Sequence, residues 1–122
     1  MAAEKSPPQP WDATWEIAFD RFDKLATDQP RFSSTRDVIA ALKDMPEVRG
    51  LFIKSSMFTA FITPYSCYPD FFDGRRITID VDRNSTVIVR YLRDGFDKSP
   101  AEYTFAVEEA ATQIAALCRE HL

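Results

Sequence analysis

The sequence is poor in the residue on which phosphate-binding loops are built. It has only three glycines in 122 residues, and Gly50, Gly74 and Gly95 are each more than 20 positions from the next. A loop that cradles phosphates needs several glycines within a few residues, because its backbone must turn sharply and approach the phosphate closely. Nucleotide binding through a glycine-rich loop is therefore excluded.

Histidine and cysteine are also scarce, with one histidine and two cysteines in the chain. His121 is the penultimate residue, and a fraying last turn is a poor place to hold an imidazole against a nucleophile as hydrolases require. Cys118 and His121 share one helical face, but with Cys67 they supply three ligands, whereas zinc sites usually have four in paired spacing. We expect two reduced thiols, no metal and no cofactor, and an enzyme is the less favoured class.

Long apolar runs are missing as well. No stretch approaches the roughly 20 apolar residues that cross a membrane, and Met1 to Pro10 lacks the basic start and apolar stretch of a secretory signal. Two cysteines are too few for a disulfide framework. These observations predict a cytoplasmic protein without membrane association.

Basic residues are fewer than acidic residues in the chain as a whole. Lys and Arg number 15 against 19 Asp and Glu, a net charge of −4, which argues against general nucleic-acid binding because that needs clustered basic residues. Residues 75–93 are the exception, with five arginines against two aspartates. Asp80 and Asp82 share a strand face with Arg90 and Arg76, so we favour a solvated ionic ladder over a catalytic carboxylate pair.

Aromatic residues, in contrast, are abundant. The chain has ten phenylalanines, four tyrosines and two tryptophans, and it is 45% hydrophobic and 28% charged, a composition typical of globular proteins. Its length is that of one domain, since domains most often have about 100–150 residues. Residues 1–10, with three prolines, are predicted to be a flexible tail, and residues 11–122 a single domain.

Two helices are predicted at the start of this domain. Apolar residues recur at three- and four-residue steps over residues 11–26, and the following proline predicts that the helix ends before Asp28. Ser34 and Asp37 form an N-cap pattern for a second, shorter helix, which stops at Pro46.

Residues 50–63 are rich in aromatic and β-branched side chains. The polar interruption at Lys54, Ser55 and Ser56 predicts two short strands joined by a tight turn, and one buried helix is the alternative. Apolar residues occur on both faces of the second strand, which is typical of an inner strand or of one that is covered on both sides.

Residues 76–93 form the clearest local pattern, a β-hairpin with apolar residues in strict alternation. A three-residue loop at 83–85 gives the register in which the apolar partners meet. The predicted pairs are Val81 with Val87, Ile79 with Val89, and Ile77 with Tyr91.

The last segment contains two conflicting signals. Ser99 to Glu102 has the pattern of a capping box with proline at the first helical position, which predicts a helix start. Tyr103 to Phe105 has strand character, so residues 101–105 are left as strand or helix. Beyond them an apolar stripe from Val107 to Leu122 predicts a long helix.

The resulting order is two helices, about four antiparallel strands in one sheet, and a long C-terminal helix packed on the sheet. This is an α+β fold with its helices on one face of the sheet.

The connection PYSCYPDFFDGRR, residues 64–76, is the candidate site. It is long for a connection between strands, and aromatic residues and arginine are enriched at the centres of interfaces. The candidate residues are Tyr65, Tyr68, Phe71, Phe72, Arg75 and Arg76.

Three functions are consistent with this loop. The leading hypothesis is a non-catalytic module that binds another protein or a second copy of itself as a homodimer. The first alternative is a small-molecule pocket in which the loop is a lid and Arg75 or Arg76 contacts an anionic ligand. The second, weaker alternative is nucleic-acid binding through the basic hairpin 75–93.

Overall fold

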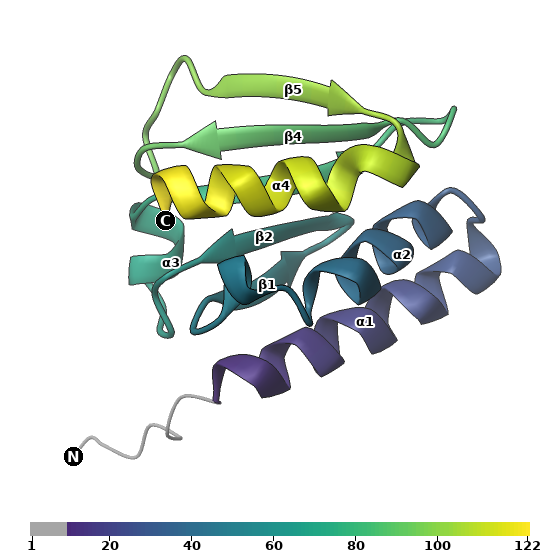
Figure 1. Cartoon of the computed structure of the whole chain (residues 1–122), viewed down its shortest axis with the longest axis horizontal. Helices are drawn as coiled ribbons and strands as arrows, with labels where there is room; N and C mark the ends of the chain where they lie inside the picture. Colours follow the sequence, from purple (N-terminus) through teal and green to yellow (C-terminus); the bar gives the residue numbers. More distant parts are fainter. Residues whose placement is uncertain (1–9) are drawn as a thin grey trace.

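A computed structural model of the chain describes residues 10–122 (Figure 1). The tail predicted for residues 1–10 lies, except for Pro10, outside the described residues. The helices are α1 (Trp11–Asp28), α2 (Phe32–Leu42), the 3₁₀ turn η1 (Pro46–Val48), α3 (Asp70–Asp73) and α4 (Val107–His121). The strands are β1 (Phe52–Ser56), β2 (Thr59–Thr63), β3 (Arg76–Val81), β4 (Val87–Leu92) and β5 (Ala101–Phe105).

The five strands form one antiparallel sheet in the order β1-β2-β3-β4-β5. Helices α1, α2 and α4 pack on one face of this sheet, with α1 beside β1 and α4 across the middle of the sheet, between β4 and β2 in the view of Figure 1. The predicted α+β class is confirmed, with five strands where about four were expected.

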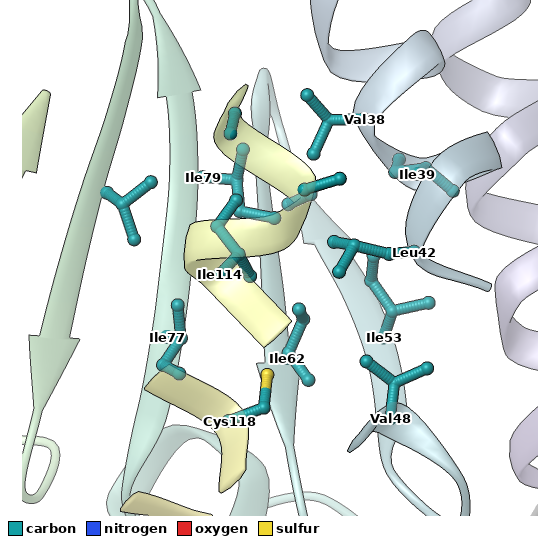
Figure 2. Packing of buried hydrophobic residues seen from close by; sticks show 14 of the residues in the cluster. Val38, Ile39, Leu42, Val48, Ile53, Ile62, Ile77, Ile79, Ile114 and Cys118 are labelled. Carbon is teal, nitrogen blue, oxygen red and sulfur yellow. The ribbon is translucent and has the colours of Figure 1, made fainter. Parts of the chain in front are cut away.

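The core lies between this sheet face and the three long helices. Ile53, Ile62, Ile77 and Ile79 project from the strands toward Ile114 of α4, as Figure 2 shows. The remaining large buried side chains come mainly from α1 and α2: Trp15, Phe22, Phe32, Val38, Ile39 and Leu42. The long stripe predicted for the last helix is the surface that α4 buries.

The first helix begins and ends close to the predicted positions, whereas the second starts two residues before its predicted cap. Phe32 is the first residue of α2 and its ring is buried 6.1 Å from Phe22, so packing in the core extends the helix past Ser34. Ser34 is consequently a buried residue inside the first turn.

Residues 50–63 form two strands, which confirms the prediction favoured over a buried helix. The turn between the strands lies at Met57 and Phe58. The turn predicted at Lys54 to Ser56 is wrong, because these residues complete β1. Lys54 fits within a strand because its side chain lies on the face away from the helices, with its ammonium 5.2 Å from the ring centroid of Phe71. The second strand, β2, is an inner strand, as predicted.

The hairpin of β3 and β4 has the predicted register, with Val81 opposite Val87 and Ile79 opposite Val89. Asp82 stabilises its three-residue loop, because its carboxylate accepts hydrogen bonds from the N–H groups of Asn84 and Thr86 at 2.8 and 2.9 Å. Ser85 has a φ of 64°, the left-handed conformation that such loops require.

Residues 101–105 are a strand, which decides between the two alternatives, and the capping-box pattern at Ser99 to Glu102 does not start a helix. The pairing of β5 with β4 places Tyr103 opposite Val89 and Glu102 opposite Arg90. Glu102 accepts a hydrogen bond from Arg90 Nε at 2.8 Å instead of capping a helix. The helix begins at Val107, after an extended Ala106 whose N–H donates to Glu109 at 3.4 Å.

No helix within residues 10–122 combines the length and the apolar character needed to cross a bilayer.

Candidate functional site

The connection between β2 and β3 forms a short helical turn, α3, rather than an open loop. The N–H groups of Phe72 and Asp73 both donate to the carbonyl of Pro69 at 2.9 Å, and Gly74 N–H donates to Asp70 at 2.8 Å. The Asp73-Gly74 dipeptide is typical of a turn, and four residues are too few to show helical periodicity in the sequence.

Four aromatic rings gather around α3. Phe61 of β2 points to the sheet face away from the long helices, where Phe71 and Phe72 cover it at centroid distances of 5.9 and 5.4 Å. Tyr68 packs edge-on against both at 5.9 and 6.0 Å. Phe61 is thereby buried, while Tyr68 is 69% and Phe72 36% exposed.

Tyr65 and Arg75 form a separate pair within the connection. Arg75 Nη1 donates to the Tyr65 hydroxyl at 3.1 Å, and the guanidinium lies 5.7 Å from the Tyr65 ring centroid. The backbone of Gly74 lies against the same ring, since a Cβ at this position would be 2.1 Å from it. Tyr65 and Arg75 are both half-buried, and their contacts with each other brace the connection.

Arg76 ties α3 to the sheet. Its Nη1 donates to the carbonyl of Phe72 at 2.6 Å, and its guanidinium lies 6.0 Å from the ring centroid of Phe61. Burial lowers the pKa of Arg76, and the charge of Asp73 partly offsets this effect. Of the six predicted site residues, Tyr68 and Phe72 are therefore exposed, and Phe71 is partly buried against both of their rings. The other three, Tyr65, Arg75 and Arg76, stabilise the conformation of the connection.

A second loop, residues 93–100 between β4 and β5, lies against α3. Gly95 N–H donates to the carbonyl of Asp73 at 2.8 Å, and a Cβ on Gly95 would be 2.5 Å from the carbonyl oxygen of Phe72. Gly95 is thus required by the close approach of two backbones. Its neighbour Phe96 is 81% exposed.

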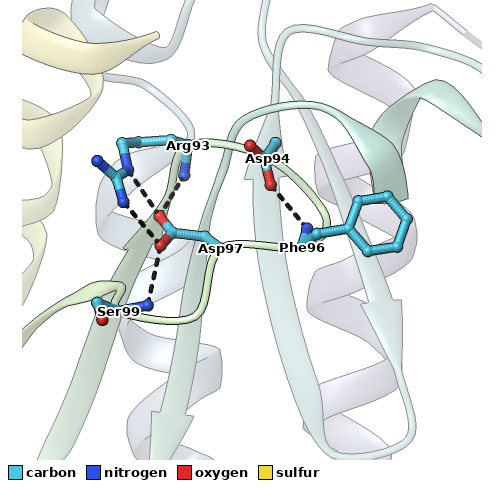
Figure 3. Close-up of polar contacts among 5 residues, drawn as sticks. All are labelled: Arg93, Asp94, Phe96, Asp97 and Ser99. Atoms are coloured by element: carbon cyan, nitrogen blue, oxygen red, sulfur yellow. Dashed lines mark hydrogen bonds and ion pairs between the residues drawn. The ribbon is translucent and has the colours of Figure 1, made fainter.

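The conformation of this second loop is fixed by Asp97 (Figure 3). Its carboxylate accepts hydrogen bonds from Arg93 N–H, Nε and Nη2 and from Ser99 N–H, at 3.0, 3.0, 3.1 and 3.0 Å. Asp94 in turn accepts from the N–H of Phe96 at 2.7 Å. Phe96 is therefore presented to solvent by a loop whose backbone is held from both sides.

We call Tyr68, Phe71, Phe72 and Phe96 the aromatic end. Phe96 was missed at the sequence level, because a single phenylalanine among charged loop residues has no periodicity. The sequence does contain one indication of its exposure: Phe96 is the single large apolar residue in the polar segment RDGFDKS, residues 93–99.

A depression of about 400 Å³ adjoins the aromatic end at the β1 edge of the sheet, between α1 and α3. Its lining residues come from α1, β1, β2 and α3: Thr14, Ile17, Ala18, Ile53, Lys54, Ser55, Phe61, Phe71 and Phe72. Lys54 is the one cation among them, and neither Arg75 nor Arg76 lines the depression.

The groups considered for catalysis have other partners. Asp80 accepts from Arg90 Nη1 at 3.4 Å and from the Thr59 hydroxyl, which confirms the pair Asp80–Arg90 of the predicted ladder. Asp82 and Arg76 take no part in it, because Asp82 binds the hairpin loop and Arg76 the carbonyl of Phe72. His121 stacks on Tyr91 with ring centroids 4.1 Å apart. Over residues 10–122, no three His, Cys, Asp or Glu side chains are grouped so that they could hold a metal ion.

Comparison of the chain with protein-family models, with curated proteins and with solved structures finds no match.

Proposed function

We propose that the protein is a non-catalytic protein-binding module whose contact surface is the aromatic end. The observation that carries the proposal is the exposure of Tyr68 and Phe96, 69% and 81%, on backbone segments that are hydrogen-bonded to each other and to the sheet. Aromatic side chains on a backbone that is already fixed lose little conformational entropy on binding. Tyrosine and phenylalanine are also enriched at interface centres.

The arginines have a different role in this proposal from the one their sequence suggested. Arg75 and Arg76 hold Tyr65 and the carbonyl of Phe72, so they shape the surface from within. The partner is therefore expected to offer an apolar recess for the rings of Tyr68 and Phe96 rather than a cluster of acidic residues. The compartment we propose is the cytoplasm, which suits a chain whose Cys67 and Cys118 are both unpaired.

A pull-down from native cell extract tests the proposal. Partners held by the wild-type chain should be lost with the double variant Tyr68→Ala/Phe96→Ala, since truncating an interface anchor typically weakens binding by tenfold or more. Met57→Ala is the matched control, because Met57 is 75% exposed on the β1–β2 turn, at the opposite end of the strands. Retention of every partner by the double variant would refute this function.

The depression beside α1 supports a second candidate function, binding of a small anionic molecule with an apolar body. Lys54 would meet the anionic group, and Ile17, Phe61 and Phe71 the apolar part. A thermal-shift screen against anionic metabolites should then show a rise in Tm that Lys54→Ala removes. An unchanged Tm across the screen counts against the pocket and leaves the protein-binding proposal intact.

A further inference from the structure

The two edge strands of the sheet, β1 and β5, differ in whether another part of the chain covers them. At the start of β1, side chains of α1 bind two backbone groups on the outer side of the strand: Thr14 Oγ1 accepts from the N–H of Ile53 at 3.1 Å, and Trp15 Nε1 donates to the carbonyl of Leu51, the residue before β1, at 2.9 Å. Arg21 donates to the carbonyl of Met57 in the adjoining turn. Helix α1 thus lies along this edge and binds its backbone at Leu51, Ile53 and Met57, so a further strand would have to displace it.

The direction of the β5 backbone groups follows from the β3–β4 hairpin. Asp82 N–H donates to the carbonyl of Thr86, so this is a hydrogen-bonded pair, and such pairs alternate along an antiparallel ladder. Val87, Val89 and Tyr91 must then bond toward β5, and Ala101, Tyr103 and Phe105 toward β4. The N–H and C=O groups of Glu102 and Thr104 consequently point outward.

The β5 edge is open, as Figure 1 also shows. Among residues 10–122, no hydrogen bond reaches the outward groups of Glu102 or Thr104. Edge strands are normally protected by charged side chains, above all lysine, by proline, by a bulge or by a covering segment. Within Ala101–Phe105 the one charged side chain, Glu102, is paired with Arg90 of the neighbouring strand; there is no lysine or proline, and the pairing with β4 runs without a bulge.

We infer that β5 pairs with β5 of a second copy of this chain, antiparallel, about a two-fold axis that passes between the two Tyr103 residues. In this register Glu102 lies opposite Thr104 of the partner subunit, and each such pair exchanges both of its N–H···O=C bonds. The two sheets join into one continuous sheet, with both copies of α4 on the same face. This interface lies apart from the aromatic end and does not depend on the proposed function.

The side chains of β5 fit this self-pairing. A carboxylate at Glu102 faces a hydroxyl rather than a second carboxylate, so no like charges lie directly opposite each other, and each Glu102 is paired with Arg90 of its own subunit. Tyr103 is 36% exposed and stacks on Phe105 at 6.0 Å with an interplanar angle of 7°. The two-fold axis places its ring beside Tyr103 of the partner subunit, which covers both rings on the helix side of the sheet.

Sedimentation equilibrium tests the assembly. The chain should approach twice its mass of 14.0 kDa as its concentration rises to about 0.5 mM, where even a weak pairing with a Kd of about 0.1 mM gives mostly dimer. Thr104→Pro should return it to one chain, because proline removes an outward N–H that β4 does not use. Circular dichroism is expected to match the wild type.

Cysteine cross-linking tests the register, in a Cys67→Ser background because Cys67 is exposed. Tyr103→Cys should form a disulfide-linked dimer, since a non-hydrogen-bonded pair has Cα atoms about 4.5 Å apart. Ala101→Cys is the matched control: its two copies would be about 14 Å apart, four residues along the strand, and should not cross-link.

A single-chain mass at every concentration, or cross-linking of Ala101→Cys as fast as Tyr103→Cys, would overturn this dimer. In the first case the open edge would belong to a strand from a different protein. The variant Tyr68→Ala/Phe96→Ala separates the two proposals, because it should remain a dimer while losing the partners of the aromatic end. A variant that loses partners and stays dimeric supports both surfaces, whereas one that becomes monomeric contradicts their independence.

Discussion

Asp97 accepts three hydrogen bonds from one residue, Arg93, through its backbone N–H and two guanidinium nitrogens at 3.0 to 3.1 Å. The Arg93 side chain is exposed, yet that of Asp97 is only 1% exposed. Hydrogen bonds from Arg93, together with one from Ser99 N–H, hold the pKa of Asp97 well below the ordinary carboxyl range. The charged form of Asp97 is therefore the one that organises the loop carrying Phe96.

Replacing Asp97 by Asn should lower Tm and speed amide exchange at Arg93 and Ser99. Because the pKa of Asp97 is lower in the folded chain, its contribution is complete above the ordinary carboxyl pKa of about 4 and declines as the pH falls toward the folded value. The Tm difference between wild type and Asp97→Asn should thus be largest near neutral pH and shrink in acid. A difference that grows in acid would contradict this role.

Met57→Gly should stabilise the protein by about 1 kcal/mol, measured by urea unfolding. Met57 has a φ of 56°, a left-handed conformation that favours glycine, and its exposed side chain makes few contacts to lose. Met57→Ala removes the same side chain but keeps the backbone cost, so it should show no such gain. Equal effects of the two substitutions would locate the change in the side chain instead.

Gly95→Ala should destabilise the protein by roughly 1–3 kcal/mol, the usual cost of forcing an atom into a packed site. Its Cβ would be 2.5 Å from the Phe72 carbonyl oxygen, so α3 and the second loop must separate. Fluorescence or NMR shifts at the rings of the aromatic end should report that movement.

Gly50→Ala provides the comparison for this variant. Gly50 has a φ of 81°, but no atom lies within 4 Å of a new Cβ at this position. The loss of stability in Gly50→Ala therefore comes from the strained backbone alone. This variant should leave the aromatic end unperturbed, and a shift of the Phe72 signals in both variants would weaken the steric explanation.

The two thiols should differ sharply in reactivity. Cys67 is exposed, whereas burial, with a smaller contribution from the charge of Glu47, raises the pKa of Cys118 to about 12. A thiol reagent at pH 8 should modify one cysteine rapidly in the native protein and the second only after unfolding. Cys67→Ser should abolish the fast phase, and its persistence would contradict the burial of Cys118.

Elements whose pattern is local were predicted well. The alternation over residues 76–93 allows one register in which Ile79 meets Val89, because a shift by one residue would turn every apolar side chain to the other face. The first and last helices likewise carry uninterrupted apolar stripes, which α1 and α4 bury.

Elements that depend on distant partners were predicted poorly. Ala101 to Phe105 becomes a strand because β4 offers it an edge and Arg90 binds Glu102, although the local cap pattern favoured a helix. The contact of Gly95 with Phe72 joins segments that are remote in sequence, so no pattern within either segment indicates it. The role of Phe96 at the aromatic end depends on that contact.

The contacts of Thr14 with Ile53 and of Trp15 with Leu51 also bear on the proposed dimer, because they would limit how many copies of the chain can assemble. A sheet with one free edge can pair once, and the pair then has no free edge left. A sheet with two free edges could add copies at both sides without end and grow into a fibre. Because α1 lies along β1, only the β5 edge is free of a covering helix, so the pairing proposed for β5 would stop at two chains.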